Sequence, residues 1–350
     1  MKVCIIFTGG TIGSRVDENG RITTEGNSPY TLLEMYRNQY NDDIEFVVEE
    51  PYCILSENLA AAHIRKLASC VNRMVKESGL DGIIITHGTD TLQYSAALLG
   101  YIFGAVQLPV ILVSADFALS DERSNGLDNF RYALEFIKGK YGTGVFVSYC
   151  NKGDVPVIHR GTRIQQHLPL SADVVSIGNS WYGKFEDGRY IQNPEYIVRD
   201  GLPAMFEDTE NINLSEFSDE IMRIIPYVGM PYPELSEHTR AVLHESFHSG
   251  TIAISEGLNE FADIAHRRNI PIFLTGLSER EAEYETVSCY RKAGIQPLCE
   301  SAPIAQYCKL WLALSNRIEP DKIMHISVAE DFITICLLYT SPSPRDRTRS

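Results

Sequence analysis

The sequence lacks several features that would identify its class at once. It contains no run of about 18 uninterrupted apolar residues, the length that a membrane-spanning helix needs. Its eight cysteines form no C-x-x-C pair and no Cys/His cluster at metal-ligand spacing, so neither disulfides nor a zinc site are expected. Only 31 Lys and Arg residues stand against 46 Asp and Glu, a net charge of −15. Such a balance disfavours binding to nucleic-acid phosphates.

The beginning of the sequence offers no targeting signal either. A single basic residue, Lys2, precedes an apolar run that ends at Gly9, too short for the core of a signal peptide. Together with the scattered cysteines, this favours a cytoplasmic protein. Its expected ligands are small molecules, with no nucleic acid and no membrane as partner.

The end of the sequence differs in character from the rest. Residues 336–346 resemble a translated sequencing-library adapter, so residues 336–350 are treated as an artefact tail and left out of the fold prediction. With 350 residues and 44% hydrophobic composition, the remainder is long enough for two globular domains.

Strand and helix patterns alternate along the first part of the chain. Short apolar runs rich in β-branched residues predict buried strands, and apolar residues at helical spacing predict helices between them. The predicted strands are residues 3–7, 81–86, 109–113 and 144–149, and the predicted helices are residues 60–76, 92–103 and 129–138. This order predicts an α/β fold with a mainly parallel sheet, helices on both faces and right-handed crossovers. Residues 151–154 are expected to form a hairpin turn.

A smaller α/β domain is predicted after a polar and acidic connection. Strand-like runs alternate again with helix-like ones, and these are residues 221–225, 258–268, 270–274 and 284–293. The predicted organisation is an N-terminal domain of residues 1–192, a linker of residues 193–218 and a C-terminal domain of residues 219–335.

Two polar segments directly follow predicted strands. Residues 8–13 (TGGTIG) come after the first strand and residues 87–91 (HGTDT) after the second. In open parallel sheets, sites lie at the carboxyl ends of strands. Neither segment has the glycine spacing of a P-loop or of a dinucleotide-binding turn. The Thr11 hydroxyl among glycine N–H groups fits a nucleophile beside an oxyanion-stabilising backbone, with a plain tight turn as the alternative.

The second segment places a hydroxyl next to a carboxylate. Thr89 can relay a proton if a base is hydrogen-bonded to it, and Asp90 can bind a substrate ammonium group. Asp90 by itself fits an N-cap equally well, because a helix is predicted to begin near Leu92.

Taken together, TGGTIG near the N-terminus and HGTDTL further along resemble the L-asparaginase family, specifically its bacterial cytoplasmic type and the related glutaminases. A weaker resemblance runs from Lys2 to about Asn316. It implies a two-domain asparaginase-like fold, no metal or organic cofactor, and a homodimer or homotetramer. The implied reaction is hydrolysis of the side-chain amide of L-asparagine, or of a related amide, to aspartate and ammonia.

The resemblance also implies roles for individual residues. Thr11 would be the acylated nucleophile, Thr89 would hydrogen-bond the substrate or polarise the attacking water, and Asp90 would bind the substrate α-ammonium. Backbone N–H groups near Gly10 and Gly88 would hold the oxyanion. Contacts to the substrate are further implied for Ser56 (at its α-carboxylate), Glu57 (where the family often has Gln) and Ala115 (through its backbone).

One position departs from the family where it matters. Gln166 stands where the family has a lysine that forms a triad with the second Thr-Asp pair, and an amide has no usable basicity near neutral pH. The neighbouring His167 is one candidate replacement base, and Arg163 is another source of positive charge. In the C-terminal domain, Ile304 stands in place of an expected carboxylate.

Residues 14–30 follow Thr11 and are rich in Gly, Ser, Thr, Asn and charged residues. The resemblance implies a lid that closes over the substrate and excludes water. An ordinary solvated loop would have the same composition.

Three functional hypotheses follow. The first is an amidohydrolase of the asparaginase type, favoured by Thr11, Thr89 and Asp90. The second is an impaired family member that binds an amino-acid-like ligand as a sensor or partner subunit, favoured by Gln166 and Ile304. The third is an amidotransferase component acting on charged transfer RNA, which Glu57 suggests and the acidic charge disfavours.

Overall fold

A computed structural model of the chain describes residues 1–13, 15–16, 22–23, 30–197, 204–216, 220–276 and 285–333. The predicted tail, residues 336–350, lies outside these ranges. Most of the predicted lid, residues 14–30, lies outside them as well. The described part of that loop includes two short antiparallel strands, β2 (Arg15–Val16) and β3 (Ile22–Thr23).

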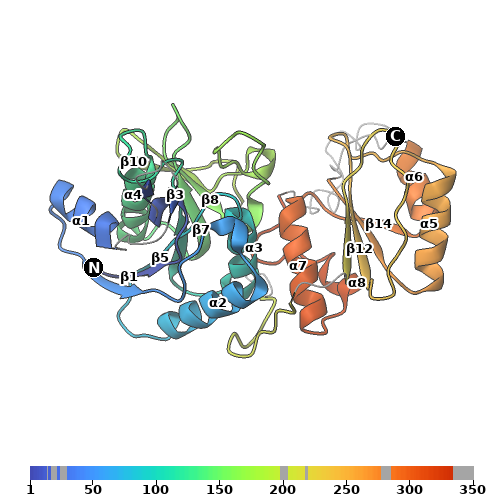
Figure 1. Cartoon of the computed structure of the whole chain (residues 1–350), viewed down its shortest axis with the longest axis horizontal. Coiled ribbons are helices and arrows are strands. Elements are labelled where there is room, and N and C mark those ends of the chain that lie inside the picture. The colour runs from blue at the N-terminus through green and yellow to red at the C-terminus, as the bar shows by residue number, and fades with distance from the viewer. Residues whose placement is uncertain are drawn as a thin grey trace, which may run out of the picture.

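The first part of the chain forms an eight-stranded sheet, which confirms the predicted α/β class (Figure 1). The strand order is β10-β9-β8-β7-β6-β5-β1-β4, and the five strands from β7 to β4 are parallel. These five are β1 (Lys2–Phe7), β4 (Glu45–Glu49), β5 (Gly82–Thr86), β6 (Pro109–Val113) and β7 (Gly144–Tyr149). The edge is antiparallel and consists of β8 (Val157–Arg160), β9 (Gly183–Glu186) and β10 (Arg189–Gln192). The turn predicted at residues 151–154 lies between β7 and β8.

Both faces of this sheet are covered at its centre, which explains why β1, β5, β6 and β7 are almost uniformly apolar. Along β1, Val3, Ile5 and Phe7 belong to one hydrophobic cluster, whereas Cys4 and Ile6 belong to another. The first cluster is completed by α1 (Tyr30–Gln39) and α4 (Gly126–Gly139), and the second by α2 (Ala61–Val75) and α3 (Leu92–Phe103). Because successive side chains of a strand point to opposite faces of the sheet, the sheet separates two hydrophobic cores.

The prediction that every crossover is right-handed is wrong for one of them. Three connections have the same hand, as judged from their direction across the sheet and from the face that their helix covers. They are β1-α1-β4, β4-α2-β5 and β5-α3-β6. The connection β6-α4-β7 runs in the same direction as β5-α3-β6 but places its helix on the opposite face, so it has the opposite hand. The reason is space, because α3 already packs over β7 on the other face.

The second part of the chain forms a four-stranded parallel sheet in sequential order. Its strands are β11 (Ile221–Ile224), β12 (Ala241–Glu245), β13 (Ile272–Thr275) and β14 (Ile295–Pro297). One face is covered by α5 (Glu256–Arg267) and α6 (Glu285–Lys292), and the other by α7 (Pro303–Ser315) and α8 (Pro320–Ile323). Two sheets with helices on both faces match the predicted pair of α/β units.

Helix α7 lies between the two sheets (Figure 1). Its Ile304 and Cys308 pack into the core shared with α3, while Leu310 and Leu314 pack against the second sheet. Ile304 is 1% exposed. The apolar residue at this position therefore serves the core that joins the two units.

The connection predicted as a linker also contributes to a core. Met205 and Leu214 are buried in the cluster formed by α2 and α3. The Arg65 guanidinium on α2 donates a 2.6 Å hydrogen bond to the Leu214 carbonyl and pairs with Glu216. The described part of this polar connection is therefore held against the first unit.

A buried histidine on β8 makes stability depend on pH. His159 is 3% exposed, its Nδ1 lies 2.9 Å from Ser176 Oγ, and burial lowers its pKa from 6.5 to about 3. Because the unfolded chain binds this proton more readily, stability is full above pH 6.5 and falls as the pH drops toward 3. The expected loss at pH 4 is on the order of 3 kcal/mol.

This dependence can be measured by urea unfolding between pH 7 and pH 4. His159→Gln should flatten the curve, while His238→Gln, at an exposed position, should leave it unchanged. Equal pH slopes for the parent chain and His159→Gln would contradict the assignment.

Candidate active site

The two polar segments, residues 8–13 and 87–91, meet where the order of the strands reverses direction across the sheet. The chain passes from β1 to β4 on one side and then to β5 on the other, so the switch point lies between β1 and β5. Such a point opens a crevice at the carboxyl ends of the strands. Residues 8–11 follow β1 and residues 87–91 follow β5, which places both predicted segments at this crevice.

Three backbones approach closely there. A Cβ atom added to Gly10 would lie 2.2 Å from the Gly88 nitrogen, and one added to Gly88 would lie 2.4 Å from Ser56 Oγ. Gly10 also has a φ of 75°, which disfavours any side chain. The Gly10 amide donates to the Ile54 carbonyl at 2.9 Å, which fixes this turn against the segment that leads to Ser56. The structure therefore brings Gly10, Gly88 and Ser56 into contact.

Thr11 is half-buried and begins a short 3-10 helix, Thr11–Gly13. The Gly13 amide donates to the Gly10 carbonyl at 3.0 Å, so the segment is indeed a tight turn. Thr8, three residues earlier, is buried and donates from its hydroxyl to the Thr86 carbonyl at 2.5 Å. Of the two threonines in this segment, the Thr8 hydroxyl ties β1 to β5, whereas Thr11 lies at the carboxyl end of β1.

The second segment leaves its carboxylate in solvent. Thr89 is half-buried and Asp90 is exposed. The N-cap of α3 is Thr91 rather than Asp90, so the alternative role considered for Asp90 is wrong. The Thr91 hydroxyl donates to the Ser56 carbonyl at 2.9 Å, which joins this segment to the third one.

A buried histidine forms hydrogen bonds beside the turn that contains Gly88. His87 Nδ1 lies 2.8 Å from the Gly88 carbonyl, so it donates there, and Nε2 accepts from the Ser95 hydroxyl at 2.8 Å. Burial lowers the pKa of His87, which keeps the ring neutral. Both ring nitrogens are thereby used for structure, and the Gly88 peptide is held in one orientation.

The remaining predicted contacts differ in exposure. Ser56 is buried and Glu57 is exposed, and both belong to the 3-10 helix Ser56–Asn58. Ala115 is buried after β6, and a Cβ atom on Gly126 would lie 3.0 Å from its side chain and 3.3 Å from Ile12. The loop after β6 thus packs beneath the 3-10 helix that begins at Thr11.

Gln166 and His167 have different surroundings. Gln166 is exposed, and its Oε1 accepts a 3.0 Å hydrogen bond from Arg223 on β11. His167 is half-buried, and its Nε2 is buried without a hydrogen-bond partner among the described residues. Burial lowers the pKa of His167, and the charges of Asp90 and Asp173 oppose that shift.

The sequence patterns did not identify Arg223, whose guanidinium donates a hydrogen bond to Gln166. Arg223 donates from Nε to Glu245 at 2.7 Å and from Nη1 to the Tyr94 hydroxyl at 3.3 Å. Tyr94 lies on α3, so the cluster spans both units. No local pattern marks these three residues, because β11, β12 and α3 meet only in the folded chain.

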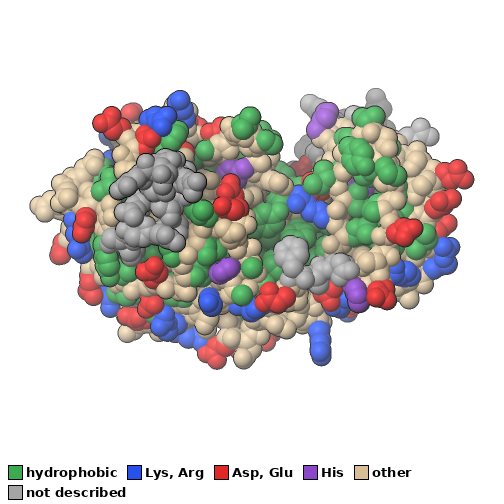
Figure 2. Space-filling model, in the orientation of Figure 1, with side chains coloured by type: hydrophobic (Ala, Val, Ile, Leu, Met, Phe, Trp, Pro, Cys, Tyr) green, Lys and Arg blue, Asp and Glu red, His purple; other side chains and the backbone are tan. Residues whose placement is uncertain are grey.

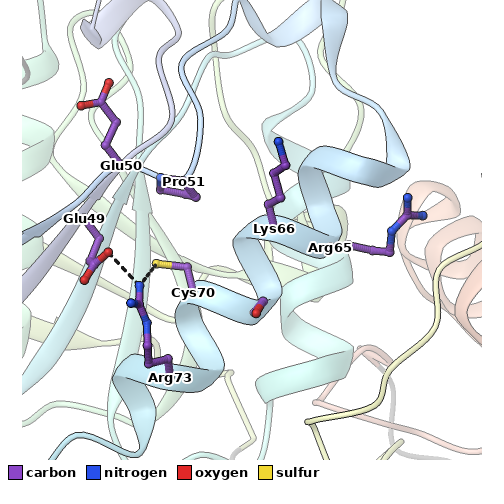
Figure 3. Close-up of a pocket in the computed structure, with 8 residues that line it drawn as sticks. Glu49, Glu50, Pro51, Arg65, Lys66, Cys70 and Arg73 are labelled. Atoms are coloured by element: carbon purple, nitrogen blue, oxygen red, sulfur yellow. Dashed lines mark hydrogen bonds and ion pairs between the residues drawn. The ribbon is translucent and has the colours of Figure 1, made fainter.

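A separate hollow lies beside α2 (Figure 3). It has a volume of about 600 Å³ and is lined by Glu49, Glu50, Pro51, Arg65, Lys66, Ser69, Cys70 and Arg73. Much of its charge is neutralised internally, since Arg73 pairs with Glu49 at 2.8 Å. No site is assigned to it.

The surface charge agrees with an acidic protein. On the face drawn in Figure 2, the described Lys and Arg side chains are interspersed with Asp and Glu and form no continuous band. No helix in the described part of the chain combines the length and the apolar character needed to cross a membrane.

Comparison with known proteins gives the family. The family model described as "Asparaginase, N-terminal" matches residues 2–189. A glutamyl-tRNA(Gln) amidotransferase component from Haloquadratum walsbyi is 27% identical over 93% of this chain and 74% of its own length. An L-asparaginase from Bacillus licheniformis is 31% identical over 38% of this chain and 40% of its own length.

Solved structures support the same fold. The thermostable L-asparaginase from Thermococcus kodakarensis superposes with a TM-score of 0.77 at 23% identity, covering 95% of this chain and 99% of that one. L-asparaginase I from Vibrio cholerae gives a TM-score of 0.76 at 21% identity, covering 95% and 99%. Because the family model covers more than half of the sequence and the folds agree over nearly its whole length, the chain belongs to the asparaginase family.

Proposed function

We propose that the chain is an amidohydrolase that cleaves the side-chain amide of L-asparagine through an acyl-enzyme on Thr11. The observation that carries the proposal is the contact of Gly10, Gly88 and Ser56 at the switch point between β1 and β5. It gathers the Thr11 hydroxyl, backbone N–H groups and the Asp90 carboxylate at one edge of the sheet.

The chemistry proceeds in two half-reactions. The Thr11 oxygen attacks the amide carbon, the C–N bond breaks, and ammonia leaves with the proton that Thr11 gave up. Water then attacks the ester, the bond to the Thr11 oxygen breaks, and aspartate is released. Because the Gly10 N–H donates to the Ile54 carbonyl, the N–H group of Gly88 is proposed as the oxyanion donor, and its close packing against Gly10 and Ser56 restricts its reorientation.

Recognition of the amino acid is assigned to the neighbouring polar groups. The Asp90 carboxylate, which is exposed, is proposed to bind a substrate ammonium group, and Ser56 is proposed to contact the α-carboxylate. Thr89 orients the attacking water. Glu57 stands on the same 3-10 helix as Ser56 and is exposed, and it is proposed to contact the polar end of the ligand.

Ammonia release from L-asparagine, L-glutamine and their D-forms tests this function. We expect turnover of L-asparagine, with L-glutamine slower by roughly 10- to 200-fold, because one methylene changes transition-state binding by about 1 to 3 kcal/mol. Binding of these amino acids without any ammonia release would instead support the impaired, ligand-binding member of the family.

A second candidate is a component of an amidotransferase that supplies ammonia for charged transfer RNA. It is favoured by the similarity over 93% of this chain to proteins named as glutamyl-tRNA(Gln) amidotransferase components. Ammonia release that occurs only with a partner protein and charged transfer RNA present would support this candidate. Release by the chain alone at its full rate would support the free amidohydrolase.

A further inference from the structure

An arginine of the second unit binds groups on both sides of the contact between the units. Arg223 lies on β11, and only 19% of its side chain is exposed. Its Nε and Nη2 both contact Oε1 of Glu245 on β12, at 2.7 and 2.5 Å. Charge-assisted hydrogen bonds of this kind hold the planar guanidinium in one orientation. The group is therefore fixed within its own unit.

The other contacts of the guanidinium are made to the first unit. Nη1 donates to the Tyr94 hydroxyl on α3 at 3.3 Å, and Nη2 donates to Gln166 Oε1 at 3.0 Å. Because Nη2 contacts both Glu245 and Gln166, these two side chains lie next to the same nitrogen. Arg223 thus connects β12 of one unit with α3 and with the segment after β8 of the other.

Tyr94 belongs to the first turn of the helix that follows the second motif. Its amide donates to the Thr91 carbonyl at 3.1 Å, and the Thr91 hydroxyl donates to the Ser56 carbonyl at 2.9 Å. The neighbouring Gln93 is buried, and its Nε2 donates to the Asp90 carbonyl at 3.0 Å. A displacement of this turn therefore moves the backbone that carries Asp90.

We propose that Arg223 is a positioning residue for the substrate-binding side of this site. The inference rests on the proposed amidohydrolase function and adds to it a residue of the second unit. Arg223 acts through its neighbours, because it holds Tyr94 and Gln166 in place. Through the first turn of α3 it keeps Asp90 in the position from which the carboxylate binds the substrate ammonium group.

The same contact gives a reason for the residue at position 166. Gln166 stands where the family has a lysine, and its amide oxygen accepts from Arg223. An ammonium group has no acceptor and would repel the guanidinium at this distance. Arg223 and a lysine at position 166 are therefore mutually exclusive in this arrangement. In the absence of Arg223, such a lysine would have Glu245 as its counter-ion.

Steady-state ammonia release from L-asparagine by the full-length chain tests the role of Arg223. Arg223→Met should raise KM by about 10- to 100-fold, because the ammonium-binding group is displaced. It should leave kcat within about threefold of the parental value, because the turn that carries Thr11 is not involved. Arg223→Lys keeps the charge but loses the fork of donors, so it should recover only part of the lost affinity.

Two comparison variants separate positioning from stability. Arg240→Met removes another arginine of the second unit, which pairs with Glu220 at 3.6 Å at the opposite end of β12, and should change neither KM nor kcat. Lys309→Met breaks a buried ion pair with Asp331, and should leave KM unchanged at a temperature where the variant is folded. A parental KM in Arg223→Met, or an equal rise of KM in Lys309→Met, would overturn the inference.

Combined substitution of positions 166 and 223 tests the contact itself. Gln166→Lys should raise KM and lower the free energy of unfolding, because two cations then meet. In the Arg223→Met background the same substitution should change both quantities less, because the ammonium group can pair with Glu245. Equal effects of Gln166→Lys in the two backgrounds would show that the two positions do not interact, and the inference would fail.

Binding of L-aspartate, the product of the proposed reaction, gives a readout that needs no turnover. Calorimetry should give a Kd about 10-fold higher or more for Arg223→Met than for the parent chain, because Asp90 is displaced. Equal affinities, with ammonia still released by the parent, would overturn the inference and leave the proposed function standing. Absence of ammonia release from every amide, with a Kd that depends on Arg223, would overturn the proposed function and leave the positioning role.

Discussion

Thr11→Ala should abolish ammonia release from L-asparagine, with a loss of kcat on the order of 10⁶-fold, as expected when an enzyme loses its nucleophile. The methyl group cannot form the acyl bond, while the backbone turn at Gly10 and Gly13 does not depend on the hydroxyl. The fold should therefore survive, with a change in the free energy of unfolding of less than about 1 kcal/mol.

Thr11→Ser is the matched control, because it keeps a hydroxyl on the same turn and should retain measurable turnover. Mass spectrometry of the parent chain quenched during turnover should place the acyl group on the peptide that contains Thr11. Turnover by Thr11→Ala at the parental rate would show that another hydroxyl is acylated.

Lys309→Met should lower the free energy of unfolding by about 3 to 5 kcal/mol, because it leaves a buried carboxylate without its counter-ion. Lys309 on α7 and Asp331 are both 0% exposed in their side chains and lie 2.9 Å apart. Asp331 also accepts from the Tyr101 hydroxyl on α3 at 3.0 Å and from the Val328 amide at 2.9 Å. Asp331 thus lies where both units and the C-terminal segment meet.

Urea unfolding with two comparison variants measures this effect. Lys322→Met removes an exposed pair with Glu319 and should hardly change the free energy of unfolding, because water and salt screen the pair. Adding Asp331→Asn to Lys309→Met removes the unpaired charge and should recover part of the loss. A loss for Lys309→Met no larger than that for Lys322→Met would contradict the proposed role of the buried pair.

The same C-terminal segment holds the loop that carries His167. Glu330 pairs with Arg160 of β8 at 3.0 Å, and the Thr162 hydroxyl donates to the Ala329 carbonyl at 2.8 Å. Ala329 and Glu330 both have positive φ angles, so the chain bends sharply to reach these partners. The buried ion pairs therefore stabilise the region from which residues 166 and 167 extend.

Several elements could be predicted because their patterns are local. Residues 92–103 and 109–113 form α3 and β6 with the predicted bounds, since uniform apolar runs mark elements buried on both sides. Strand β4, Glu45–Glu49, was not predicted, because it lies at the edge of the sheet and its charged, partly exposed ends hide the strand pattern. Helix α7 was missed because it is buried on two sides and lacks a polar stripe.

The amino-acid sequence alone indicates the α/β class, the two motifs at strand ends and the family. Buried strands, glycine turns and the polar residues that follow them each occupy a contiguous stretch of sequence, so a local pattern reveals them. The opposite hand of β6-α4-β7 arises only in the folded chain, because it depends on which face of the sheet α3 leaves free. The same holds for the surroundings of Gln166 and His167. Arg223 on the second sheet binds one side chain and the fold buries the other, and no pattern within the segment itself contains that information.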